Sequence, residues 1–102
     1  MSRNLRQLAA GQRCYLSLPG ICGSPETVVL AHIRRGGIAG VGQKPCDAAA
    51  IPMCHACHDA FDGRTRTDYT REQLDAEALR GLVQWLTYLW QHEYIIPGGI
   101  AA

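Results

Sequence analysis

The sequence predicts a small α+β domain stabilised by a structural zinc, with a β-hairpin, a short metal-bearing helix and a long amphipathic C-terminal helix. Three observations lead to this class. The chain has 102 residues, the length of a single domain (1–102) that gains stability from a metal or a second subunit. It contains five cysteines, two of them in a C-x2-C motif. Its last third carries apolar residues at the spacing of one helix face.

Short elements bounded by glycine or proline are predicted in the first half of the chain. They are a helix capped by Ser2 and ending near Ala10, a strand-like run over 13–18, a strand over 26–33 and a glycine-containing loop over 34–45. Pro19-Gly20 turns the chain after the first run, which predicts a hairpin there. The core of the domain is expected over 11–68.

The second half contains the clearest element. Residues 47–53 predict a second strand or a tight approach segment, in which Pro52 excludes a long central strand. Residues 54–62 predict a short helix that Gly63 ends. A capping box at 70–73 predicts a helix over about 71–93. Its apolar positions are Leu74, Ala78, Leu82, Trp85, Leu86 and Leu89.

Composition limits the class of protein. The formal net charge is +1, and no window approaches the about 18 apolar residues of a membrane-spanning helix. The polar first residues lack the apolar region of a signal peptide, so we expect a cytoplasmic protein whose cysteines bind metal rather than form disulfides. Nine arginines stand against one lysine, which suits phosphate recognition but is equally explained by codon usage.

The cysteines predict a structural zinc site. Cys54 and Cys57 open the short helix, where both thiolates lie on one side of its first turn. Cys14 and Cys22 bracket the Pro19-Gly20 turn and supply the other two ligands of a closed tetrahedral site. Cys46 is left over as an inert or partly exposed thiol. The alternatives are a set of buried apolar cysteines, or a C-x2-C-H haem attachment motif that would require export.

Two further side chains predict an open metal site. His58 and Asp62 are four residues apart on the short helix, so both point to one face as a pair of metal ligands. Such a pair leaves coordination positions for water and phosphate oxygens. His32 ends an apolar strand just before Arg34 and Arg35. A lone histidine at such a place is often only structural.

These motifs resemble the HNH (ββα-metal, treble-clef-like) endonucleases, which combine a strand-borne histidine, a glycine-containing loop and a helix that opens C-x-x-C-H. The runs at 19–22, 25–27, 30–34 and 57–59 are similar to the small nucleases of lambdoid prophages, the YbcO-like family. The resemblance covers roughly residues 5–66. It implies a metal-dependent endonuclease that hydrolyses phosphodiester bonds in DNA, in phage recombination or repair. It leaves the form of the substrate open, with structured or junction DNA as one option.

The resemblance also implies roles for individual residues. His32 corresponds to the general base, and His58 and Asp62 to ligands of a catalytic divalent metal such as Mg, Mn or Zn. Four arginines then have phosphate-binding roles: Arg34, Arg35, Arg64 and Arg66.

The chain departs from the HNH pattern at two positions. Ala31 stands where many members have a metal-ligating Asp or His, and the central Asn is absent, with Asp47 the nearest polar candidate. Two other functions therefore stay open: a non-catalytic zinc-containing DNA-binding module, and an interaction protein that acts through its last helix. The apolar stripe of that helix is wide, and a homodimer would bury it.

Overall fold

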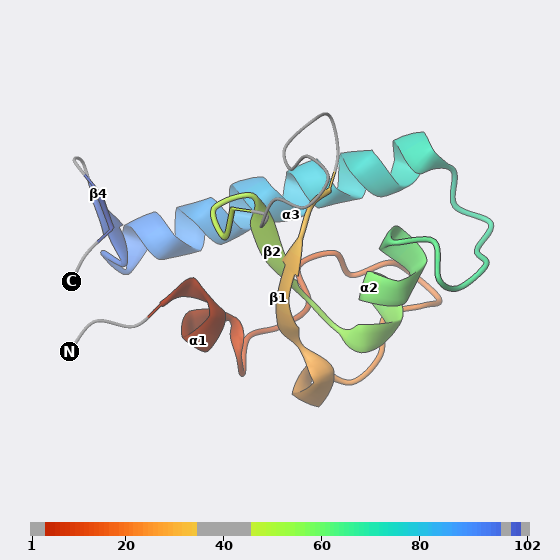
Figure 1. The fold of residues 1–102 in the computed structure, drawn as a ribbon, viewed down its shortest axis with the longest axis horizontal. Helices are drawn as coiled ribbons and strands as arrows, with labels where there is room; N and C mark the ends of the chain where they lie inside the picture. The colour runs from red at the N-terminus through yellow and green to blue at the C-terminus, as the bar shows by residue number, and fades with distance from the viewer. Residues whose placement is uncertain (1–3, 35–45, 97–98, 101–102) are drawn as a thin grey trace.

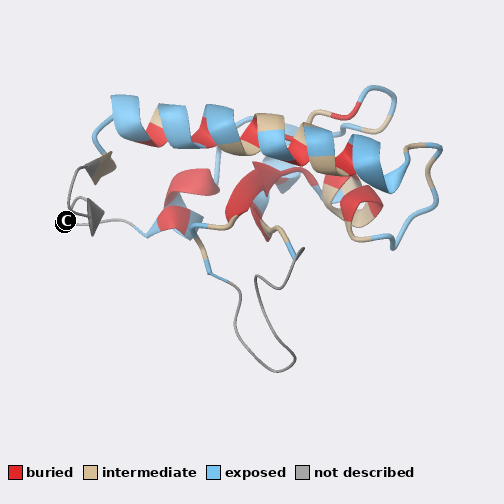
Figure 2. Cartoon of the chain, turned by 90° about the horizontal axis from the view of Figure 1, so that it is seen from above, coloured by how far each residue is buried: buried red, intermediate tan, exposed pale blue. Residues whose placement is uncertain are grey.

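The computed structural model describes residues 4–34, 46–96 and 99–100. The elements are, in chain order, α1 (Leu5–Ala9), the 3-10 turn η1 (Pro25–Thr27), β1 (Val29–His32), β2 (Ala50–Met53), α2 (His55–Phe61), α3 (Arg71–Gln91), β3 (Ile95–Ile96) and β4 (Gly99–Ile100). The long helix α3 forms one layer, and α1, the β1–β2 pair and α2 lie in a row along it as the second layer (Figure 1 and Figure 2). The fold is thus the small α+β fold that the sequence predicts.

The central sheet is an antiparallel pair. Val29 of β1 lies opposite Met53 of β2, and His32 opposite Ala50. All four residues of β2 are buried, because the strand lies between β1 and α3. A second small pair, β3 with β4, follows α3.

The predicted N-terminal hairpin is wrong, because residues 13–18 form no strand. They run beside β2 as irregular backbone, joined to it by a hydrogen bond of 2.8 Å from the Tyr15 N–H to the Pro52 carbonyl. Pro52 has no N–H with which to return a second ladder bond, so regular pairing cannot continue along this edge of β2.

Two predicted boundaries in the first half are also corrected. The cap of α1 is Asn4 rather than Ser2, because Asn4 and Gln7 form a complete capping box. The first part of the predicted strand over 26–33 is η1, capped by Ser24, so β1 begins only at Val29. Of the predicted loop over 34–45, residues 35–45 lie outside the described residues.

The predicted helices of the second half are confirmed with small changes. Helix α2 begins after its cap Cys54 and ends before Gly63, whose φ of 78° is the left-handed conformation expected of a terminating glycine. The capping box between Thr70 and Gln73 is present, and α3 ends at Gln91, two residues before the predicted end.

The core lies where α3 crosses β2 and the 13–18 segment. Trp85 is 1% exposed, and its ring meets that of Tyr15 edge-on with centroids 5.4 Å apart. Gly81 lies against the backbone of Tyr15, where a Cβ atom would stand 2.5 Å from the Tyr15 carbonyl oxygen. The absence of a side chain at Gly81 therefore lets α3 approach this segment closely.

Within residues 4–34, 46–96 and 99–100, no helix combines the length and the apolar character needed to cross a lipid bilayer.

Candidate functional site

Four cysteines from three separate segments meet at the start of α2. Cys14 follows α1, Cys22 follows a turn that contains Gly20 at a φ of 79°, and Cys54 and Cys57 belong to the cap and first turn of α2. Their sulfur atoms all lie within 4.8 Å of one another. The cluster is therefore close enough together to hold a metal ion, as the sequence predicts.

The geometry of this cysteine cluster fits zinc. Four thiolates at about 2.3 Å from a tetrahedral zinc lie about 3.8 Å apart, and the sulfurs of Cys54 and Cys22 are 3.9 Å apart. Backbone N–H groups of Ser17, Gly23 and Cys57 point at the sulfurs, at 3.3 to 3.4 Å. Such donors stabilise the negative charge of thiolates. The turn that carries Cys22 includes Ser17 with a φ of 48°, a backbone shape that the sequence did not reveal.

The metal-free thiols of the cluster do not ionise equally. A hydrogen bond from the Cys57 thiol lowers the pKa of Cys14 to about 4. The same contact raises the pKa of Cys57, and burial raises the pKa of Cys22 to about 11. In the metal-free cluster at neutral pH, Cys14 is therefore a thiolate, whereas Cys22 and Cys57 keep protons that a bound cation would displace. Cys46 is exposed and does not belong to the cluster.

His32 forms a close pair with Asp47. The His32 Nε2 atom lies 2.7 Å from Asp47 Oδ1, and the histidine side chain is 14% exposed. Arg6 of α1 reaches the same carboxylate oxygen at 3.5 Å. The pKa of Asp47 is lowered, first by the hydrogen bond with His32 and also by the charge of Arg6. The ionised carboxylate only accepts, so His32 Nε2 carries the proton and Nδ1 holds the lone pair of the neutral ring.

A second histidine–carboxylate pair lies on α2. His58 Nε2 is 3.1 Å from Asp62 Oδ2, and both side chains are largely buried. Two neighbouring ligands at about 2.1 Å from an octahedral ion are about 3.0 Å apart, so the pair fits as two adjacent ligands. Arg64 donates to the same Asp62 oxygen at 3.0 Å and to Asp59 at 3.2 Å. In the part of the chain described, the cysteine cluster is the only set of three or more metal-ligating groups this close together.

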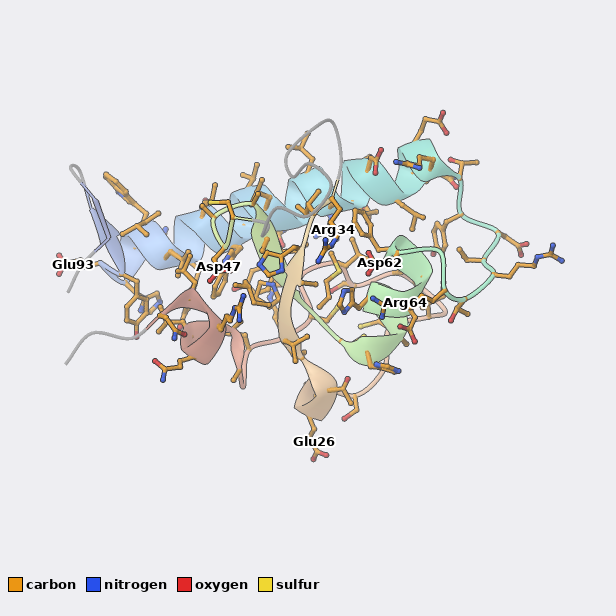
Figure 3. The ribbon with its side chains drawn as sticks, viewed as in Figure 1. Glu26, Arg34, Asp47, Asp62, Arg64 and Glu93 are labelled. Atoms are coloured by element: carbon orange, nitrogen blue, oxygen red, sulfur yellow. The ribbon has the colours of Figure 1, made fainter. Side chains whose placement is uncertain are left out.

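The predicted phosphate-binding arginines occupy different surroundings. In the view of Figure 3, Arg34 lies at the end of β1, with Asp47 on one side and Asp62 and Arg64 on the other. Arg64 is bound to the two carboxylates of α2, which its sequence position did not indicate. Arg66 lines a hollow of about 580 Å³ between α2 and the start of α3. Arg35 lies outside the described residues.

The residue before His32 faces the interior. Ala31 is 1% exposed and pairs with Ile51 of β2. A metal-ligating side chain at this position would be directed into the core rather than toward His32. Two histidine–carboxylate pairs in the described residues therefore have a largely buried histidine. One joins the end of β1 to the segment before β2, and the other lies on α2.

A protein family matches nearly all of this architecture. The family described as "Putative nuclease YbcO" matches residues 3–92. The chain belongs to the YbcO family. Relatives with the same description occur in Escherichia coli (strain K12) and Enterobacteria phage 82. Each is 45% identical over 87 residues, which are 81% of this chain and 91% of the relative.

A solved structure has the same fold. It is described as "a putative bacteriophage protein" from Escherichia coli strain K-12, substrain MG1655. It superposes with a TM-score of 0.73 at 36% identity, and the match covers 88% of this chain and 100% of that one. The resemblance to the YbcO-like family that the sequence predicts is therefore confirmed.

Proposed function

We propose that this chain is a metal-dependent endonuclease of the HNH (ββα-metal) type that hydrolyses phosphodiester bonds in DNA. The observation that carries the proposal is the presence of two histidine–carboxylate pairs with largely buried histidines on one ββα unit, in a family whose relatives are described as nucleases. Strands β1 and β2 and helix α2 follow one another in ββα order, with His32 ending β1 and His58 on α2.

His32 acts as the general base in this proposal. Because Asp47 accepts a hydrogen bond from Nε2, the free lone pair on Nδ1 takes a proton from the attacking water. Asp47 also stabilises the imidazolium that results, since its carboxylate stays ionised. Asp47 thereby orients the His32 imidazole, a role for which HNH proteins use an asparagine. Arg6 holds the carboxylate in place from α1.

His58 and Asp62 would hold the catalytic divalent cation, Mg, Mn or Zn. When bound, such an ion stabilises the charge that develops on the phosphate and on the leaving 3′-oxygen. Arg64 contacts the Asp62 oxygen that faces His58, so its positive charge would compete with a cation for this carboxylate. A cation held there would leave the guanidinium available to a substrate phosphate, and Arg64 would in this way couple metal binding to substrate binding.

The remaining arginines bind the DNA backbone. Arg34 is exposed at the end of β1, and we assign it, with its neighbour Arg35, to the phosphates next to the scissile bond. Arg66 lines the hollow beyond α2 and contacts the backbone further along. Duplex DNA and junction DNA are both substrates to test, and a role in phage recombination or repair fits the phage relative.

The cysteine cluster holds a structural zinc in this account. A treble-clef-like zinc site would fix the start of α2 to the 14–22 segment and so fix the orientation of His58. Its ligands are Cys14, Cys22, Cys54 and Cys57.

A second candidate is a zinc-containing DNA-binding module without catalysis. The buried Ala31 favours it, because the third metal ligand of many HNH enzymes has no counterpart there. This candidate predicts DNA binding that is independent of His32 and of any second metal.

Nicking of supercoiled plasmid in Mg or Mn, with a chelator control, distinguishes the two candidate functions. The rates of two variants are compared, each lacking one histidine of α2. His58→Ala removes the proposed metal ligand, whereas His55→Ala removes a histidine that also contacts an aspartate four residues on, at 3.1 Å, but is largely exposed. We expect His58→Ala to lower the nicking rate at least about 100-fold and His55→Ala to leave it within about twofold. Equal activity of both variants would contradict the proposed metal site, provided that zinc content and circular dichroism are unchanged.

A further inference from the structure

Helix α3 carries a second apolar face that points away from the core. Four large side chains on it are exposed, which we call the outer stripe: Leu79 (63%), Val83 (57%), Leu86 (39%) and Trp90 (54%). Their spacing of four, three and four residues sets them in one line along the helix, as in the seam of a coiled coil. A contiguous apolar patch of a few hundred Å² on a protein surface is often a functional contact surface.

The outer stripe is distinct from the buried face of the same helix. The residues that α3 buries are Leu74, Ala78, Gly81, Trp85 and Leu89. Figure 2 shows α3 exposed along its length on the side away from the second layer. The charged residues of the middle of α3, Glu77 and Arg80, pair with each other at 3.3 Å to one side of the stripe. No described charged side chain thus interrupts the stripe between Leu79 and Trp90.

We propose that the outer stripe binds the outer stripe of a second copy of this chain, with the two α3 helices antiparallel. The spacing of four, three and four reads the same in both directions. A two-fold axis between Val83 and Leu86 therefore sets Leu79 against Trp90 of the partner subunit, and Val83 against Leu86 of the partner subunit. Such self-complementarity is what an isologous dimer requires.

The area available suits a small dimer. At the observed exposures the four side chains present about 400 Å² of apolar surface, or about 800 Å² over two copies. Next to Leu79, a mainly apolar hollow of about 230 Å³, lined by Ile33, Leu82 and also Asp75, extends the patch. The total stays below the about 1,200 Å² at the lower end of stable interfaces, which predicts a weak, reversible dimer.

Sedimentation velocity of the full, zinc-loaded chain from about 1 to 500 μM tests the proposal. We expect a reversible dimer. Val83→Glu, which changes an exposed side chain, should raise the dimer dissociation constant at least about 100-fold while circular dichroism stays unchanged. The matched control Gln91→Glu adds the same charge at an exposed position of α3 outside the stripe and should leave the constant unchanged. Mixing Val83→Glu with Leu86→Lys should restore dimers, because only antiparallel pairing sets these positions against each other.

A chain that stays monomeric throughout this range would overturn the proposal, as would a dimer that Val83→Glu does not weaken. If the mixed variants fail to associate, the antiparallel register is wrong. Binding of a monomeric chain to phosphatidylcholine vesicles would assign the stripe to a lipid surface instead. None of these outcomes depends on nuclease activity, so the dimer and the proposed function fail or succeed separately.

Discussion

Replacing Gly81 by alanine tests the close contact between α3 and the segment that carries Cys14. In an exposed helix the change would stabilise the protein by about 1 kcal/mol, because alanine has the higher helix propensity. Here the added Cβ would stand 2.5 Å from the Tyr15 carbonyl oxygen and 2.9 Å from Ile51 Cδ1. The isoleucine methyl can rotate away. The carbonyl is a backbone group, and it can move only if the segment that the 2.8 Å hydrogen bond from Tyr15 to Pro52 holds beside β2 also shifts.

The two effects of Gly81→Ala oppose each other, and the clash is the larger. Overpacking a well-filled core costs about 1–3 kcal/mol, and a contact with a backbone atom belongs at the upper end of that range. Subtracting the propensity gain leaves a net destabilisation of about 2 kcal/mol. For a domain of this size that corresponds to a fall in the melting temperature of roughly 10 °C. Because Tyr15 adjoins Cys14, the variant should also lose zinc faster to a chelator.

Urea denaturation of the zinc-loaded protein, followed by tryptophan fluorescence at one fixed protein concentration, measures the change. The control is Ala76→Gly at an exposed position of the same helix, which should destabilise by about 1 kcal/mol through propensity alone. If Gly81→Ala raises the free energy of unfolding instead, the close packing of α3 on Tyr15 is refuted.

Three further outcomes follow from the site. Zinc binding to the reduced, metal-free chain at pH 7 should release at least two protons, because the pKa of Cys22 is about 11 and the pKa of Cys57 is also raised. Calorimetry in buffers of different ionisation enthalpy counts the released protons. Arg64→Gln should lower the Mn concentration for half-maximal cleavage, since it frees the Asp62 oxygen, while it raises the KM for DNA; the opposite metal response would contradict the coupling. Asp47→Asn should destabilise the fold at neutral pH. The pKa of this carboxyl is lowered in the folded state, so its contribution is present above about pH 4 and is lost as the pH falls through the lowered value. Denaturation curves from pH 8 down to pH 5 measure the free energy of unfolding of Asp47→Asn and of the unchanged chain. Ionisation of the Asp47 carboxyl should not make the difference between these two energies depend on pH in this range.

Local signals in the sequence predicted much of this structure. The box at Thr70 and Gln73 satisfies its own backbone donors, and Gly63 adopts the left-handed shape that ends a helix, so both act without distant contacts. The C-x2-C motif likewise depends on one helical turn. The clustering of Cys14 and Cys22 with it was predicted correctly, although the connecting backbone is an irregular loop and not a hairpin.

The features that the sequence did not reveal depend on tertiary contacts. The run at 13–18 has strand-like composition, but its neighbour in space is Pro52, which cannot complete a ladder. The contact between Asp47 and His32 arises because the β1–β2 register returns the chain to the end of β1. The binding of Arg64 to the carboxylates of α2 depends on the turn at the helix end, so arginine composition alone suggested only phosphate binding.

The proposed function depends above all on His32 acting as the base of a metal-dependent nuclease. The initial rate of supercoiled-plasmid nicking in Mn, for the unchanged chain and for His32→Ala at equal zinc content and with a chelator control, tests this role. We expect nicking that requires the metal and falls by about 10²–10⁴-fold in the variant. Equal nicking by both proteins would contradict the role of His32, and DNA binding without nicking by either would favour the non-catalytic module.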